Sequence, residues 1–141
     1  MLSLEVYQTT VQVVHLPSPI PSFIIDKEGI FDKIFERVRA LSPSNRDIDF
    51  INHPGFSHNF HLTGEDEDAI RKFFTDDLIH FLEGNKIHHI ESNGEALMIY
   101  TFVHIAQTEE VLNMLNFSSS LLSHMDLKEA HELHNSTTNK I

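Results

Sequence analysis

The sequence predicts an α+β fold, a two-layer sandwich in which a mostly antiparallel β-sheet carries about three helices on one face. Segments with the composition of strands occur in pairs, and a segment with the apolar spacing of a helix follows each pair. This strand-strand-helix rhythm is repeated three times. Because consecutive strands tend to pair with each other, the pattern favours a single sheet that is covered by the intervening helices.

The first unit begins with Leu4 to His15, which is rich in Val and Thr as strands are, and extends again at Phe23 to Ile25 after a proline-containing turn. Asp26 stands where it can cap the N-terminus of a following helix, and Pro43 ends that helix. The apolar positions of the predicted helix are Ile30, Phe31, Ile34, Phe35, Val38 and Leu41.

The second unit repeats this order with an extended segment from Asp47 to Ile51, a turn at Asn52 to Gly55 and a strand from Phe56 to Leu62. The acidic stretch from Thr63 to Glu67 starts a helix, because carboxylates are favourable at the positive end of the helix dipole. Glu83-Gly84-Asn85 ends it. The predicted buried stripe is Ile70, Phe73, Phe74, Leu78, Phe81 and Leu82.

The third unit is a hairpin in which Asn93-Gly94 joins Ile87 to Ser92 with Glu95 to Val103, and Thr108 to Glu110 opens the last helix. A two-residue loop sets the expected register. The expected pairs are Ser92 with Glu95, Ile90 with Leu97 and His88 with Ile99. The opposite face of the hairpin is expected to carry Glu91, Ala96, His89, Met98, Ile87 and Tyr100.

We expect one domain over residues 1–123, followed by a polar, flexible C-terminal tail over residues 124–141. A chain of 141 residues, 40% of them hydrophobic, is long enough to bury one core. The net charge of −11 argues against nucleic acid or an anionic membrane surface as a partner. The absence of cysteine excludes disulfides, thiolate metal ligands and a thiol nucleophile.

A string of short patterns, in order, covers roughly residues 8 to 122. The patterns are Gln8-Thr9, Leu16-Pro17, Pro21, Phe23, Asp47-Ile48-Asp49-Phe50, His53-Pro54, Phe56-Ser57, Leu62 to Glu67, Ile70-Arg71, Phe73-Phe74, and Glu91 before Asn93-Gly94. This string resembles the soluble domain of an uncharacterised family of small bacterial membrane proteins, whose members carry one or two N-terminal transmembrane helices. The present sequence has no apolar run of about 18 residues. We therefore expect a soluble piece of a longer protein, or a naturally short relative.

The resemblance implies a parent protein that is tethered to the bacterial inner membrane, with this domain on the cytoplasmic face. It implies no reaction. The sequence also lacks a phosphate-binding loop and a dinucleotide fingerprint. Our leading hypothesis is a non-enzymatic sensory or protein-interaction domain that binds a protein partner or a second copy of itself as a homodimer, without a cofactor. The alternatives are a metal-dependent hydrolase and a small-molecule or lipid-binding module.

Asp47 and Asp49 are the first candidate site residues. They stand two apart in a predicted strand, which places their carboxylates on the same face at roughly 7 Å. Such a pair can serve as acid and base or hold a hard cation. The alternative is a solvent-exposed face opposite Ile48 and Phe50.

His53, His58 and His61 are candidate zinc ligands because imidazole is a common ligand of that ion. In a strand, however, His58 and His61 point to opposite sides of the sheet. A site would need a further ligand such as Asp49 or Glu91. Glu91 is itself a candidate for receiving a ligand's proton or a partner's cation, and its alternative is an exposed hairpin carboxylate.

Overall fold

The computed structural model describes residues 8–27, 47–85, 89–100 and 104–127. The strands are β1 (Gln12–His15), β2 (Phe23–Lys27), β3 (Phe60–Thr63), β4 (His89–Ser92) and β5 (Ala96–Tyr100). They form one antiparallel sheet in the order β1-β5-β4-β2-β3. The described helices are α2 (Pro54–Asn59), α3 (Glu67–Phe73), α4 (Asp76–Glu83) and α5 (Thr108–His124). The predicted α+β class is confirmed.

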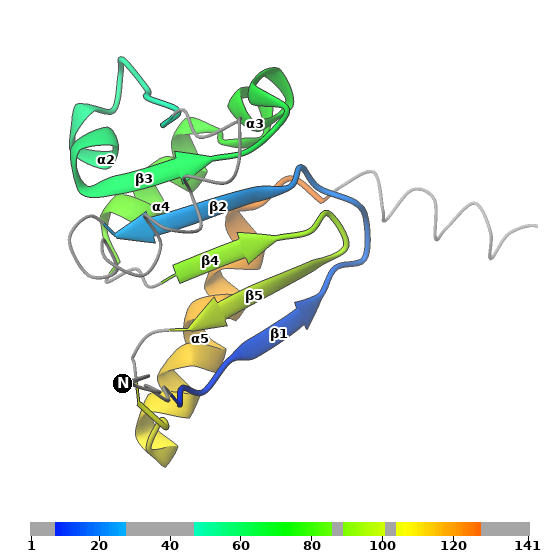
Figure 1. Cartoon of the computed structure of the whole chain (residues 1–141), viewed down its shortest axis with the longest axis vertical. Coiled ribbons are helices and arrows are strands. Elements are labelled where there is room, and N and C mark those ends of the chain that lie inside the picture. Colours follow the sequence, from blue (N-terminus) through cyan, green and yellow to red (C-terminus); the bar gives the residue numbers. More distant parts are fainter. Residues whose placement is uncertain (1–7, 28–46, 86–88, 101–103, 128–141) are drawn as a thin grey trace, which may run out of the picture.

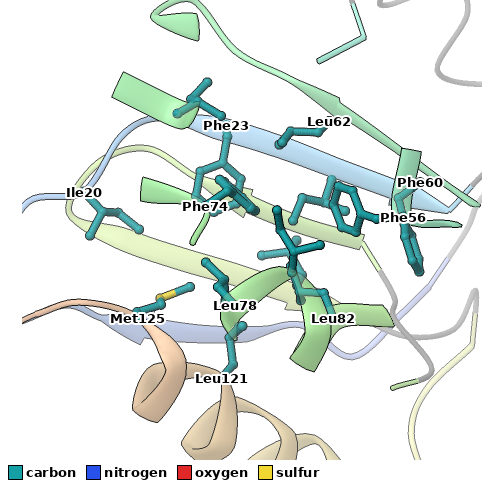
Figure 2. Close-up of a cluster of buried hydrophobic side chains, with 14 of the residues drawn as sticks. Ile20, Phe23, Phe56, Phe60, Leu62, Phe74, Leu78, Leu82, Leu121 and Met125 are labelled. Carbon is teal, nitrogen blue, oxygen red and sulfur yellow. The ribbon is translucent and has the colours of Figure 1, made fainter. Parts of the chain in front are cut away.

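Two layers make up the molecule, with α4 and α5 behind the sheet in the view of Figure 1. We call the opposite side of the sheet the outer face. Every second residue of a strand points to the helices. Figure 2 shows strand and helix side chains packed together between the two layers. Among the described residues, the largest fully buried side chains are Phe23, Phe56, Ile25, Leu62, Ile70, Leu78, Ile79, Leu82, Ile90, Leu97, Ile99 and Leu121.

The second strand of the first unit is confirmed as β2. Of the first predicted strand, residues 12–15 form β1, whereas residues 8–11 have no regular secondary structure. The helix predicted between Ile30 and Leu41 lies outside the described residues, as do residues 1–7. The helix that Asp26 was expected to cap lies outside the described residues, so that role stays a prediction. Asp26 belongs to β2 and is 4% exposed, because its side chain pairs with His89 inside the sheet.

The second unit differs most from the prediction. Residues 47–50 have no regular secondary structure, and the strand predicted from Phe56 is instead helix α2 followed by the short strand β3. Pro54 stands in the first turn of α2, where its fixed φ and missing N–H suit a helix. The N–H of Phe56 donates to Oε1 of Glu83 at 3.1 Å. This cap comes from a distant segment, so the local pattern could not reveal it.

The helix predicted after Thr63 is broken at Phe74–Thr75 into α3 and α4. The side chain of Asp66 accepts from the N–H of Ala69 at 3.0 Å, and that of Thr75 accepts from the N–H of Leu78 at 3.3 Å. Each helix therefore has its own N-cap. The predicted stripe survives the break, with Ile70, Phe74, Leu78 and Leu82 buried and Phe73 and Phe81 partly buried.

The hairpin of the third unit is confirmed, but its register is displaced by two residues. Ser92 lies opposite Leu97 and Ile90 lies opposite Ile99. Asn93 Oδ1 accepts from the N–H groups of Glu95 and Ala96, and Gly94 takes a positive φ of 98°. Asn93 thus precedes the two central residues of the turn, which are Gly94 and Glu95. Because the displacement is an even number, the described side chains of β4 and β5 keep their predicted faces. Ile87 and His88 lie outside the described residues.

The last helix, α5, starts at Thr108 as predicted, with a capping box between Gln107 and Glu110. It ends at His124. Met125 is 7% exposed and belongs to the core, so the packed part of the chain extends past residue 123. Residues 128–141 lie outside the described residues, and the flexible tail stays a prediction. Among the helices that the structure describes, none is both long and apolar enough to cross a bilayer.

Candidate functional site

The outer face of the sheet carries a polar row across three neighbouring strands. His89 of β4 lies directly opposite Tyr100 of β5. On its other side, the pairing of Ile25 with Ile90 brings the next residue of β2, Asp26, beside His89. All three side chains share one face because the strand period is two. We call Asp26, His89, Tyr100 and the neighbouring Glu91 the outer-face cluster.

Both ring nitrogens of His89 are held by carboxylates. Nδ1 contacts the carboxylate of Asp26, and Nε2 contacts Oε1 of Glu91 at 2.7 Å. The imidazole is completely buried, whereas 31% of the Glu91 side chain is exposed. The ring stacks on Tyr100 with 4.5 Å between centroids. Ionised carboxylates only accept hydrogen bonds, so His89 donates from both nitrogens and is an imidazolium ion.

The electrostatics of the cluster agree with this geometry. Burial by itself lowers the pKa of His89, but hydrogen bonds and charge attraction from Asp26 and Glu91 outweigh it and raise that pKa to about 9. Burial raises the pKa of the Tyr100 phenol, and the negative charges of Glu91 and Asp26 add to this effect. At neutral pH the cluster therefore holds an imidazolium and a neutral phenol, neither of which can accept a proton as a general base.

A surface hollow of about 350 Å³ adjoins the cluster on the outer face. Its described lining residues are Val13, Ile24, Glu91, Ser92, Asn93, Ala96, Leu97 and Met98. Glu91 is the charged residue among them, and the register places it between Ile24 of β2 and Met98 of β5. Val13 and Ile24 are 57% and 39% exposed. The hollow thus presents one carboxylate among apolar side chains.

Asp47 and Asp49 do not form the predicted pair of strand carboxylates. Asp47 contacts Nδ1 of His61 at 3.0 Å, and its other oxygen accepts from the N–H of Leu62. Asp49 is exposed, and its backbone carbonyl accepts from Arg71. Asp47 therefore fastens the irregular segment before α2 to strand β3. His61 itself lies opposite Asp26 in the sheet, at the edge of the outer-face cluster.

The three candidate zinc ligands are not gathered at one point. His58 is exposed near the end of α2, so the strand parity that we used to separate it from His61 does not apply. His53 is buried and contacts Asp76. His53 also lies near His80 and Glu83, which the sequence patterns had not singled out. Their spacing of three on a predicted helix was the available signal.

The hairpin prediction did place His89, Glu91 and Tyr100 on one face, and the structure confirms that. Asp26 was missed as their partner because it was assigned to a helix cap. It lies 63 positions from His89, and no local pattern connects the two residues.

A scan against protein-family models, a search of curated proteins and a search of solved structures each returned no match to this chain.

Proposed function

We propose that this chain is a non-enzymatic protein-interaction domain whose binding surface is the outer-face hollow around Glu91. The observation that carries the proposal is a partly exposed carboxylate among apolar side chains, beside a buried imidazolium. An arrangement of this kind recognises charge and shape together. It needs no bound cofactor, because each part of it belongs to the chain.

The outer-face cluster favours binding over catalysis. A catalytic histidine needs one ring nitrogen free to take a proton from a nucleophile or from water. Both nitrogens of His89 are engaged, and its pKa of about 9 keeps it protonated at neutral pH. The cluster therefore acts as a fixed support that holds the carboxylate of Glu91 in one orientation.

The chemistry of the hollow indicates its occupant. Two carboxylates and one imidazolium leave the cluster with one net negative charge, and Glu91 is the charged member whose side chain is partly exposed. A lysine or arginine side chain of the partner would pair with Glu91. Apolar residues next to it in the partner would cover Val13 and Ile24. A second copy of this chain also carries a net charge of −11, so we favour a basic segment of another protein over a homodimer.

The test is an NMR titration of the full chain with a hexapeptide of alternating valine and lysine. We expect chemical-shift changes at Val13, Ile24 and Met98. Glu91→Gln should weaken binding about two- to fivefold, as expected for the loss of a partly exposed ion pair. The matched control is Glu95→Gln, which removes an exposed carboxylate from the same hairpin and should leave the affinity unchanged.

Three outcomes would count against this proposal. They are equal binding of a valine-glutamate peptide, shifts that map away from the hollow, and an equal effect of the Glu91→Gln and Glu95→Gln substitutions. If sedimentation shows a dimer and its interface covers Val13 and Ile24, the partner would be a second copy of this chain instead of another protein.

We also propose that the parent protein holds this domain at the cytoplasmic face of the bacterial inner membrane. The support is the family resemblance of the sequence patterns. Fractionation of the source cells should then find the native protein in the membrane pellet, released by detergent but not by high salt. Recovery in the soluble fraction would remove this part of the proposal.

The alternative functions have less support from the observed geometry. The hydrolase hypothesis required Asp47, Asp49, Glu91 and nearby histidines to converge at one point. Asp47 contacts His61 and Glu91 contacts His89, but Asp49 is exposed and its backbone carbonyl accepts from Arg71. The hypothesis of a small-molecule or lipid module placed its ligand between helices and sheet. Core side chains pack in that space, and the hollow lies on the other face of the sheet.

A further inference from the structure

A second cluster of chemically active side chains lies where α2 begins and α4 ends. His53 is the N-cap residue of α2, and His80 and Glu83 belong to the second half of α4. One nitrogen of each histidine and one carboxylate oxygen all lie within 4.8 Å of one another. We propose that these three residues form a binding site for a divalent transition-metal ion, with Zn²⁺ as the best-suited ion.

Local structure explains how the three residues meet. His80 and Glu83 stand three apart on α4 and therefore share one side of the helix. Oε1 of Glu83 accepts from the N–H of Phe56 in the first turn of α2. This hydrogen bond ties the end of α4 to the beginning of α2, and it brings the carboxylate next to His53.

The distances suit ligands that share an ion. Nδ1 of His53 lies 3.9 Å from Oε1 of Glu83, and Nδ1 of His80 lies 3.5 Å from Oε2. Both separations exceed the usual hydrogen-bond length of about 2.7–3.2 Å. Two ligand atoms about 2.0–2.1 Å from a tetrahedral Zn²⁺ ion lie roughly 3.3 Å apart. Small rotations of the side chains would bring one nitrogen of each histidine and one carboxylate oxygen to that spacing.

The surroundings of His53 orient it for metal binding. Its side chain is only 8% exposed, and its Nε2 lies 2.7 Å from Oδ1 of Asp76. Because a carboxylate only accepts, Nε2 carries a proton, and in the neutral imidazole the lone pair is then on Nδ1, which faces Glu83. A carboxylate on the far nitrogen is the usual support of a metal-bound histidine. Asp76 is thus a positioning residue.

The ligand set indicates the kind of ion. Two imidazole nitrogens and one carboxylate oxygen suit zinc, whereas Ca²⁺ and Mg²⁺ prefer oxygen ligands. The side chains of His80 and Glu83 are 70% and 29% exposed, so an ion can arrive from solvent and keep water as a further ligand. The site shares no residue with the described lining of the outer-face hollow.

The experiment is isothermal titration of the full chain with ZnCl₂, and with MgCl₂ for comparison. We expect one zinc ion per chain and no binding of magnesium. His80→Ala and Glu83→Gln should each weaken zinc binding about tenfold or more, and Asp76→Asn about tenfold. The glutamine of Glu83→Gln retains an oxygen that can accept from Phe56. The matched control is His58→Ala, which removes an exposed histidine of α2 and should leave the affinity unchanged.

Histidine-selective NMR gives a second readout that requires no substitution. Zinc should shift the ring signals of His53 and His80 at one molar equivalent and leave that of His58 in place. The proposal is overturned by the absence of zinc binding, by unchanged affinity in His80→Ala and Glu83→Gln, or by first shifts at other histidines. Circular dichroism of each variant separates lost ligands from lost structure.

Discussion

Replacing His89 with leucine is expected to lower the free energy of unfolding at pH 7 by about 3–5 kcal/mol, the usual cost of breaking a buried ion pair from one side. In the native chain Asp26 is 4% exposed and contacts His89, and the substitution removes that imidazolium from beside a buried carboxylate. Urea unfolding that is followed by circular dichroism measures the difference. The double variant Asp26→Leu/His89→Leu should recover most of the loss, because it removes the buried charge as well.

The same interaction makes stability depend on pH. The pKa of His89 is about 9 in the folded protein and ordinarily 6.5, as in the unfolded chain, so the contribution of His89 to the free energy of unfolding is complete below pH 6.5. It is lost as the pH rises through 9, and the loss amounts to about 3 kcal/mol at roughly 1.4 kcal/mol for each pKa unit. Urea unfolding between pH 6.5 and 10 should show this decline in the native chain and not in His89→Leu. A stability profile that is equally flat in both would show that His89 is not held as an imidazolium.

Phe74→Ala is expected to destabilise the fold by about 3–5 kcal/mol, the typical cost of removing a buried phenyl ring. Phe74 is 3% exposed and stands at the break between α3 and α4. Its ring meets Phe23 of β2 edge-on at 5.0 Å and Phe73 at 5.6 Å. Alanine would leave a cavity where α3 and α4 pack against the sheet. Thermal melting by circular dichroism gives the size of the effect.

The control for this substitution is Leu112→Ala on α5. Leu112 is 55% exposed, so its truncation should change stability by no more than about 0.5 kcal/mol. Similar melting temperatures for Phe74→Ala and the native chain would show that the ring is not part of the core. Equal losses of stability in Phe74→Ala and Leu112→Ala would show that the fold is destabilised by truncation of buried and exposed side chains alike.

Local periodicity was sufficient for several parts of the fold and of the site. Alternation along the hairpin placed Glu91, His89 and Tyr100 on one face, and it did so despite the wrong register. Helical spacing identified Phe74 and Leu78 as buried. These features follow from the geometry of a few consecutive residues, because the period of a strand or helix assigns each side chain to a face.

Contacts between distant segments decided the rest. The stretch Pro54–Asn59 is a helix where we expected a turn up to Gly55 and a strand from Phe56, and Glu83 caps it from 27 positions away. Asp26 is the buried partner of His89 across 63 positions. His53 likewise lies beside His80 and Glu83, which belong to a different helix. A buried charge or backbone N–H group needs a hydrogen-bond partner, and that partner can come from a distant segment of the chain. Which segment supplies it is decided only when the sheet and helices are packed together.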